Sequence, residues 1–297
     1  MKLNFDCIVI GAGPAGLAAS LYLKRAGLNV IILDKNAPGG ELLKTNIINN
    51  YLGLPNITGP ELAIEMLNHI KSLNIKIEFE EVIEIQKQNN KYIVKGKDKE
   101  LETKYIIIAT GKTPNKLKIN TEGIKGISYC AVCDGAFYKN KTVAVVGGGD
   151  TAFTDALYLS NICKKIYIII RNKIKANEQL VAKVNKTINI EILKPNEITE
   201  IISSNSVVSA VKLKNNITLN IEGIFVAIGG TPNINFIKNI KTSNGYICVN
   251  ENLETTFPNI YAIGDVIPKK YYQIISAIND GMTAALNIKE REQNETN

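Results

Sequence analysis

Two cysteines two residues apart, followed at once by an acid, form the stretch Cys130-Ala131-Val132-Cys133-Asp134-Gly135. Cysteines at this spacing can close a small disulfide, and a neighbouring carboxylate can supply the proton that a released thiolate needs. The same pair could be half of a zinc site, but no second Cys or His pair at ligand spacing accompanies it. The residues therefore predict a redox-active disulfide, with Asp134 as its acid, and no metal.

The other residues that could do this chemistry are weaker candidates. Cys7 and Cys248 lie in apolar, strand-like stretches and Cys163 ends a helical pattern, which is typical of small buried side chains. The total of five cysteines is odd, which argues against a structural disulfide framework. His69 is the only histidine and lies on an expected amphipathic surface helix over 60–73, so it is not expected to act at the disulfide.

If the disulfide receives its electrons from a dinucleotide, the chain must contain a dinucleotide site. The N-terminal region is the first candidate for that site. An apolar strand over 6–10 leads into Gly11, Gly13 and Gly16, and a helix is expected from there to about residue 26. This glycine spacing permits a tight turn, close approach of a pyrophosphate and packing of helix on strand. The next strand, 29–33, ends in Asp34, which is expected to bond a ribose hydroxyl. Further contacts are expected from the loop neighbours Pro14, Ala15, Lys35, Gly39, Gly40, Glu41 and Asn50.

A second unit repeats the first. The apolar strand 142–146 precedes Gly147, Gly149 and Ala152, a helix is expected up to about Cys163, and another strand follows over 166–170. A strand-rich stretch over 188–227 then mirrors the antiparallel strands expected over 81–103 of the first unit. Duplication of a whole α/β unit predicts two dinucleotide sites.

Two similar breaks mark the domain boundaries. Thr113-Pro114-Asn115 and Thr231-Pro232-Asn233 each interrupt the pattern, so the chain is expected to leave the first domain and return to it. The tail then supplies a strand ending in Gly264-Asp265 and a helix over 271–288, with frayed residues over 289–297. The predicted fold is α/β, with two Rossmann-like, three-layer ββα domains: a discontinuous one over 1–112 and 234–297, and an inserted one over 113–233.

Composition excludes some classes of function. The chain has 297 residues and a net charge of +7, but its lysines are scattered and it has no Trp, so no nucleic-acid partner is expected. Neither a signal peptide nor an apolar run of about 20 residues is present, so no membrane segment is expected and a soluble, cytoplasmic protein is predicted.

Five motifs together resemble the low-molecular-weight thioredoxin reductases: Gly-Ala-Gly-Pro-Ala-Gly at 11–16, Ala-Thr-Gly at 109–111, Cys-Ala-Val-Cys-Asp-Gly at 130–135, Gly-Gly-Gly-Asp-Thr-Ala at 147–152 and Gly-Asp-Val at 264–266. The resemblance covers residues 5–288. It implies a homodimeric enzyme in which Cys133 faces the flavin and Cys130 attacks thioredoxin. It also implies that one domain rotates against the other about the two crossings.

By the same resemblance, the first loop binds FAD and the second binds NADPH. FAD is then expected to contact Thr110, Gly111, Gly264, Asp265, Gln273 and Ile274 in addition to the first loop. NADPH is expected to contact Gly147, Gly149, Asp150, Thr151, Arg171 and Lys175.

Three departures from the family leave the electron donor open. The family's His-Arg-Arg-x-x-x-Arg is replaced by the stretch 170–175, which is one residue shorter and lacks one arginine, and its Arg-Gln before the last helix is Tyr272-Gln273. Residues 48–53, Ile-Asn-Asn-Tyr-Leu-Gly, resemble a clostridial branch that takes electrons from ferredoxin. NADPH is predicted as the donor, because Arg171 follows the second strand of the second unit and no acidic residue does. The alternative enzyme is a ferredoxin- or NADH-linked reductase. The alternative from another functional class is a non-catalytic flavin-binding sensor.

Overall fold

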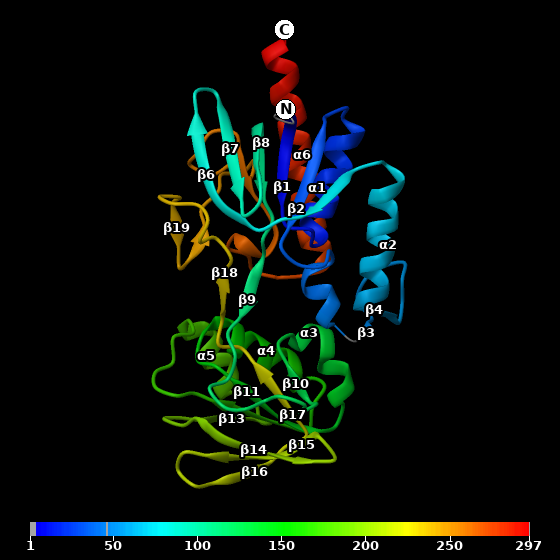
Figure 1. Cartoon of the computed structure of the whole chain (residues 1–297). Coiled ribbons are helices and arrows are strands. Elements are labelled where there is room, and N and C mark those ends of the chain that lie inside the picture. The colour runs from blue at the N-terminus through cyan, green and yellow to red at the C-terminus, as the bar shows by residue number, and fades with distance from the viewer. Residues whose placement is uncertain (1–3, 46, 297) are drawn as a thin grey trace. The chain divides into compact units, whose positions relative to one another are not determined.

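The computed structural model of the chain describes residues 4–45 and 47–296. The chain forms two compact units, which we describe separately (Figure 1). The first unit ends at Thr113 and resumes at Thr231, and the second is Pro114–Gly230. No helix within the described ranges is long and apolar enough to cross a bilayer.

The first unit is built on a mixed sheet of seven strands in the order β5-β2-β1-β8-β7-β6, with β21 also paired to β8. Strands β1, β2, β5, β8 and β21 run parallel, whereas β6, β7 and β8 form an antiparallel meander. The bounds are β1 Asn4–Ile10, β2 Val30–Asp34, β5 Lys76–Phe79, β6 Val82–Gln88, β7 Lys91–Gly96, β8 Glu100–Ile108 and β21 Ile260–Ala262. Smaller two-stranded pairs are β3 Ile47–Ile48 with β4 Ile57–Thr58, and β19 Thr242–Ser243 with β20 Tyr246–Ile247.

Strand β8 continues to Ile108, beyond the antiparallel strands expected over 81–103. It is continuous because β1 pairs with it along residues 102–108, while β7 pairs with its first half, as at Tyr92 opposite Thr103, and β21 pairs with its last three residues. One strand therefore belongs to both the meander and the parallel layer. The sequence pattern does not reveal this, because it does not show which strands pair.

The helices of the first unit are α1 Pro14–Arg25, α2 Gly59–Ser72 and α6 Ile274–Thr296, with short 3-10 turns η1 Gly40–Lys44 and η3 Gly264–Val266. Proline occupies the first turn of α1, where its missing N–H costs no hydrogen bond. Helix α2 begins with a capping box in which Thr58 and Glu61 each bond the other's backbone N–H.

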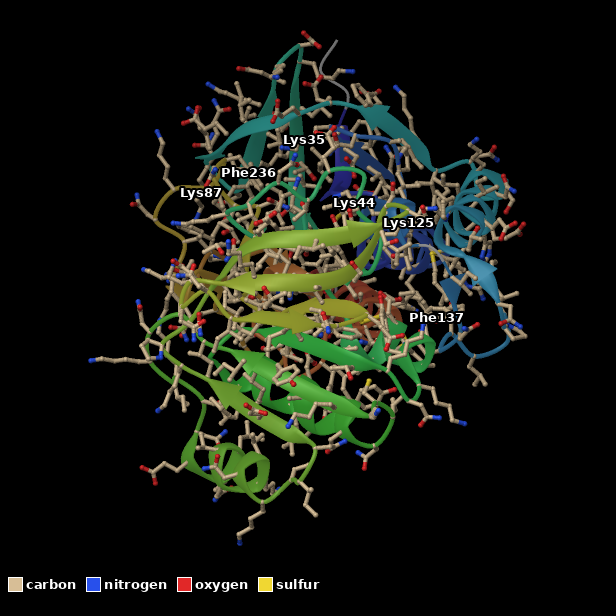
Figure 2. The ribbon with its side chains drawn as sticks, turned by 90° about the horizontal axis from the view of Figure 1, so that it is seen from below. Lys35, Lys44, Lys87, Lys125, Phe137 and Phe236 are labelled. Carbon is tan, nitrogen blue, oxygen red and sulfur yellow. A yellow bond between two sulfur atoms is a disulfide. The ribbon has the colours of Figure 1, made fainter. Side chains whose placement is uncertain are left out.

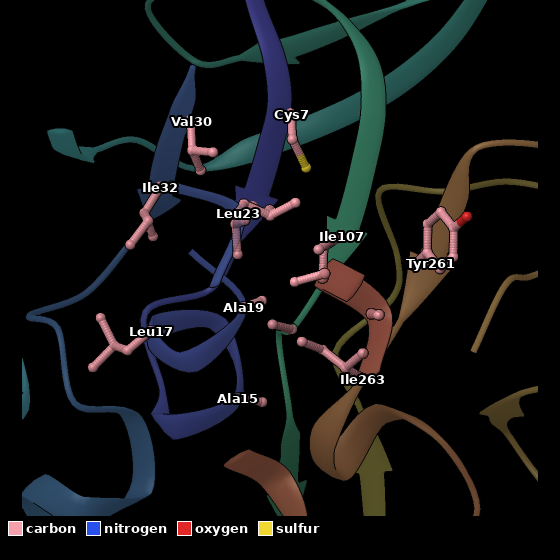
Figure 3. Packing of buried hydrophobic residues seen from close by; sticks show 14 of the residues in the cluster. Cys7, Ala15, Leu17, Ala19, Leu23, Val30, Ile32, Ile107, Tyr261 and Ile263 are labelled. Carbon is pink, nitrogen blue, oxygen red and sulfur yellow. The ribbon is translucent and has the colours of Figure 1, made fainter. Parts of the chain in front are cut away.

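One hydrophobic core of this unit lies between the parallel layer and helices α1 and α6. Cys7 and Ile107 from the sheet and Leu23 from α1 are fully buried together (Figure 3). Burial strongly raises the pKa of the Cys7 thiol, which makes it an inert apolar side chain as predicted. A Cβ on Gly281 of α6 would lie 2.4 Å from the carbonyl oxygen of Ala15, so glycine allows α6 to pack directly against α1.

The C-terminal residues correct another prediction. Residues 289–297 were expected to be frayed, but α6 continues to Thr296; Asn297 lies outside the described residues. Lys104 forms ion pairs with Glu292 and Glu295, and Arg291 forms a bidentate pair with Glu254. These partners are distant in sequence, so the charged composition of the tail did not reveal them.

The second unit repeats this plan, which confirms the predicted fold class. Its parallel sheet has the order β10-β17-β11-β12-β13, and a separate antiparallel sheet has the order β14-β15-β16. The bounds are β10 Ile127–Ser128, β11 Thr142–Val146, β12 Lys165–Ile169, β13 Ile190–Leu193, β14 Ile198–Ser204, β15 Val207–Leu213, β16 Thr218–Asn220 and β17 Gly223–Val226. The helices are α3 Ala131–Asp134, η2 Gly135–Tyr138, α4 Asp150–Ser160 and α5 Glu178–Asn185.

Helix α5 was not predicted, since its eight residues show only a short apolar pattern. It begins where the Asn177 side chain accepts a hydrogen bond from the Leu180 N–H at 3.0 Å.

The chain passes between the units along two short paired strands, β9 Lys112–Pro114 and β18 Gly230–Pro232. Asn233 closes this ladder: its N–H bonds the carbonyl oxygen of Gly111 at 3.0 Å, and its side-chain amide bonds that of Thr110 at 3.0 Å.

Candidate active site

The disulfide lies at the start of a one-turn helix in the second unit. Cys130 and Cys133 are bonded with an S–S distance of 2.07 Å, and both residues are half-buried. Cys130 precedes α3, and its Sγ accepts a hydrogen bond from the Cys133 N–H at 3.2 Å. The helical turn brings the two sulfurs together because residues three apart lie on the same helix face.

The acid beside the disulfide is oriented by a serine that sequence reasoning missed. The hydroxyl of Ser128 lies 2.6 Å from Oδ2 of Asp134 and accepts a bond from the Cys130 N–H at 3.1 Å. Ser128 is only 4% exposed, so water cannot readily replace it. One buried hydroxyl thus links the predicted proton donor to the backbone of a reactive cysteine, and its place at the end of β10 gave no motif to recognise.

Exposed apolar side chains surround this stretch. Tyr129 is 42% exposed, Val132 is 40% exposed and Phe137, labelled in Figure 2, is 47% exposed. Large apolar groups left in water next to a reactive centre are typical of a surface that binds another molecule. Two of the remaining predicted bystanders behave as expected, since Cys163 is buried with its pKa raised by burial to about 11, and His69 is exposed on α2. Cys248 corrects the prediction of a buried side chain, because it follows the short strand β20 and is only half-buried.

The glycines of the first loop differ in what they permit. A Cβ on Gly11, which has φ +109°, would lie 2.3 Å from the carbonyl oxygen of Ala109, and one on Gly16 would lie 1.9 Å from that of Gly11. The fold itself therefore requires these two glycines. A Cβ on Gly13 would meet no atom within 4 Å, and its φ of −77° suits any residue. Gly13 instead leaves open space at the N-terminus of α1, where helix N–H groups favour phosphate.

The other predicted residues of this loop converge on it. Oδ2 of Asp34 accepts a bond from the Ala12 N–H at 2.7 Å, and Oδ1 accepts one from the Asn36 N–H at 2.8 Å. The Gly39 N–H donates to Ala12 O at 2.8 Å, and a Cβ on Gly40 would lie 3.3 Å from the Cα of Gly13. The Pro38–Glu41 stretch thus adjoins the first loop, with Pro14 and Ala15 beginning α1. Glu41 itself is exposed and pairs with Lys44 at 2.7 Å.

A cavity of about 300 Å³ lies near the end of β2, and it includes a residue missed by the sequence analysis. It is lined by Lys35, Asn36, Phe79, Glu80, Glu81, Lys97 and Asp98. Glu80 is 3% exposed; its Oε1 accepts a bond from the Asp98 N–H at 3.2 Å, while its Oε2 has no hydrogen-bond partner among the described residues. A buried carboxylate oxygen without a partner is costly, so it indicates a polar group that belongs in this cavity.

The tail supplies the remaining predicted contacts of the first unit. The Gly264 N–H donates to Oδ2 of Asp280 at 2.8 Å, and Lys269 pairs with the same buried carboxylate. Burial raises the pKa of the neighbouring Asp265, and the ammonium groups of Lys112 and Lys269 oppose this rise.

Two further contacts lie at the start of α6. Asn50 donates to Oε1 of Gln273 at 3.0 Å, directly before Ile274 begins the helix. Lys112, which the sequence analysis did not single out, has its Nζ 3.0 Å from the ring centroid of Tyr272.

The predicted residues Thr110 and Gly111 follow strand β8. Thr110 donates its hydroxyl to the carbonyl oxygen of Asn233 at 2.7 Å, and Gly111 has φ +62°.

The second loop reproduces the first. A Cβ on Gly147, with φ +150°, would lie 2.3 Å from the carbonyl oxygen of Ala227, whereas one on Gly149 would meet no atom within 4 Å. Asp150 and Thr151 begin α4 and are exposed, and Arg171 and Lys175 are exposed on the loop after β12. Both units thus leave open space at the middle glycine, at the N-terminus of a helix.

Comparison with known proteins agrees with this geometry. The pattern of the pyridine nucleotide-disulphide oxidoreductase family matches residues 5–281. Thioredoxin reductase from Ureaplasma parvum serovar 3 is 42% identical over 298 residues, which cover 96% of both chains. The crystal structure of thioredoxin reductase from Streptococcus pyogenes MGAS5005 matches with a TM-score of 0.91 at 33% identity, covering 99% of this chain and 100% of that one.

A ferredoxin-flavin thioredoxin reductase from Clostridium acetobutylicum matches with a TM-score of 0.56 at 30% identity, covering 98% of this chain and 99% of that one. The duplicated nucleotide units, the paired cysteines with their acid, and the near full-length similarity agree. This chain belongs to the pyridine nucleotide-disulphide oxidoreductase family and, within it, to the thioredoxin reductases.

Proposed function

We propose that this enzyme uses NADPH and FAD to reduce the Cys130–Cys133 disulfide, and that the resulting dithiol reduces thioredoxin or a thioredoxin-like protein. The observation that carries the proposal is the half-buried disulfide with Asp134 beside it and exposed apolar side chains around it. A non-catalytic flavin sensor has no use for an acid held in place by a buried serine.

The first unit fits FAD, as two of its features indicate. Gly13 leaves open space at the start of α1, which suits the pyrophosphate. Glu80, near the Asp34 assigned to the ribose, has a buried carboxylate oxygen without a hydrogen-bond partner among the described residues. FAD held by this unit would supply the means of carrying two electrons from NADPH to the disulfide. The residues assigned to FAD are Gly11, Gly13, Pro14, Ala15, Gly16, Asp34, Lys35, Gly39, Gly40, Glu41, Asn50, Glu80, Thr110, Gly111, Gly264, Asp265, Gln273 and Ile274.

The reduced cysteines then act on the protein substrate. The Cys130 thiolate attacks one sulfur of the substrate disulfide and forms a mixed disulfide, releasing the other sulfur as a thiolate. The Cys133 thiolate next attacks Cys130, which restores the disulfide and releases the second substrate thiolate. Asp134, oriented by Ser128, supplies a proton at this site. Tyr129, Val132 and Phe137 provide the apolar contact for the partner.

Substitution of the cysteines tests this scheme. Cys130→Ser and Cys133→Ser should each abolish thioredoxin reduction and leave flavin reduction by the donor intact, because only the exchange step needs the sulfurs. Cys163→Ser is the matched control, since its buried thiol takes no part. Normal turnover in either active-site variant would exclude the disulfide from the electron path.

The donor is assigned to NADPH because the loop after β12 carries Arg171, Lys173 and Lys175 and no acid. Reduced ferredoxin is the second candidate, because a ferredoxin-flavin thioredoxin reductase is among the structural relatives. Anaerobic flavin reduction with NADPH, NADH and reduced ferredoxin in parallel separates them. Bleaching by ferredoxin alone, with neither nicotinamide effective at millimolar concentration, would overturn the NADPH assignment.

The assembly is proposed to be a homodimer, on the basis of the family resemblance. Light scattering of the FAD-loaded protein should give twice the chain mass of 32.6 kDa. A single-chain mass at micromolar concentration would contradict it. A cytoplasmic location stays a prediction from the sequence.

A further inference from the structure

The loop that follows β12 carries three cations without a carboxylate partner. Arg171, Lys173 and Lys175 are all exposed, and none of them forms an ion pair within the described part of the chain. Such a loop binds a phosphate more tightly when its backbone is held in place, because an exposed, flexible lysine loses much entropy on binding.

The loop is fastened to the second glycine turn. The N–H groups of Lys175 and Ala176 both donate to the carbonyl oxygen of Gly148, at 2.6 and 3.0 Å. A Cβ on Gly148 would lie 2.9 Å from the carbonyl oxygen of Lys173, so glycine is needed for this close approach. The sequence analysis did not single out Gly148, because its role depends on residues far along the chain.

The end of the loop is fastened by Asp150. Its Oδ1 accepts hydrogen bonds from the Asn177 backbone N–H at 2.7 Å and from the Asn177 side-chain amide at 3.3 Å. Asn177 in turn caps α5 by accepting the Leu180 N–H at 3.0 Å. Asp150 therefore connects the N-terminus of α4, where the pyrophosphate of NADPH is assigned, to the cationic loop.

We propose that Asp150 is a positioning residue for 2′-phosphate recognition: it holds the 171–177 loop so that the loop's cations select NADPH over NADH. This inference rests on the proposed function of the second unit and refines it. The prediction that Asp150 contacts the cofactor directly changes accordingly, because its carboxylate is engaged with Asn177.

Binding of fragments tests the proposal without turnover. Calorimetry on the FAD-loaded protein would compare 2′,5′-ADP with 5′-AMP, and the ratio of their dissociation constants reports the 2′-phosphate alone. We expect the unmodified protein to prefer 2′,5′-ADP by about tenfold or more, since one charge-assisted contact is worth about this factor. Asp150→Ala should reduce that preference by most of this factor.

Two variants separate positioning from charge. Asp150→Asn keeps an oxygen that can accept from Asn177, so it should retain the preference; if the carboxylate acted through its charge, Asp150→Asn would behave as Asp150→Ala does. Glu178→Ala is the matched control, because it removes an exposed acid that neighbours the same loop and should leave the ratio unchanged.

A fourth variant applies if Asp150→Ala does not fold. Asn177→Asp keeps the α5 cap but sets a carboxylate against Asp150, so it should reduce the preference in a folded protein. An unchanged ratio in Asp150→Ala, or in Asn177→Asp if the former is unfolded, would overturn the positioning role while leaving the NADPH assignment standing. Equal affinity for both fragments in the unmodified protein would overturn the assignment and the inference together.

Discussion

Replacement of Ser128 by alanine tests the local architecture of the disulfide site. The substitution removes a hydroxyl that lies 2.6 Å from Oδ2 of Asp134 and 3.1 Å from the backbone nitrogen of Cys130. Because Ser128 is 4% exposed, water cannot fully replace either contact. Leaving buried polar groups without their hydrogen-bond partner costs about 1–3 kcal/mol, so the free energy of unfolding should fall by roughly that amount.

The same substitution should slow thioredoxin reduction about tenfold, because Asp134 loses the group that orients it beside the disulfide. Rapid-mixing assays would measure flavin reduction by NADPH and thioredoxin reduction separately, and only the latter should change. Ser160→Ala is the matched control: its hydroxyl donates to the carbonyl oxygen of Leu157 on α4, away from Asp134. Equal rates of thioredoxin reduction in Ser128→Ala and Ser160→Ala would refute the orienting role.

Two further predictions concern the first glycine loop and a half-buried acid. Gly13→Ala should fold with unchanged stability, because its Cβ meets no protein atom within 4 Å, yet bind FAD at least about tenfold more weakly in a fluorescence titration; unchanged affinity would argue against close approach of a pyrophosphate there. Burial raises the pKa of Asp155 from its ordinary value of 3.8 to about 6, so the cost of ionising it in the folded protein is fully present above pH 6 and disappears as the pH falls towards 4. Asp155→Asn should therefore stabilise the protein by up to about 3 kcal/mol at pH 8 and by nearly nothing at pH 4 in denaturant titrations; an equal gain at both pH values would contradict this.

The duplicated architecture could be predicted because its signals are local. Apolar runs bounded by glycine mark β1 and β11, and the glycines that follow are needed by the backbone itself, as the contacts of Gly11 and Gly147 demonstrate. The cysteine pair and its acid are adjacent in sequence, so residue type and spacing were enough to recognise them together.

The residues that were missed depend on distant parts of the chain. Ser128 matters because β10 ends next to α3, and Glu80 matters because a turn of the β7–β8 hairpin covers it. Gly148 and Asp150 act on a loop that is remote from them in sequence. Helix α6 extends further than predicted for the same reason, since Lys104 and Glu254 hold its charged end. Residue type and spacing do not encode such contacts, which arise only when the sheets bring the segments together.

The most direct test of the proposed electron path is an anaerobic reductive titration of the FAD-loaded enzyme. A chain that uses both FAD and the Cys130–Cys133 disulfide takes up about four electrons before the flavin is fully reduced, two for each centre. The double variant Cys130→Ser/Cys133→Ser should take up about two, and Cys163→Ser should still take up about four. Uptake of only two electrons by the unmodified enzyme would contradict the account, because the disulfide would then not exchange electrons with the flavin.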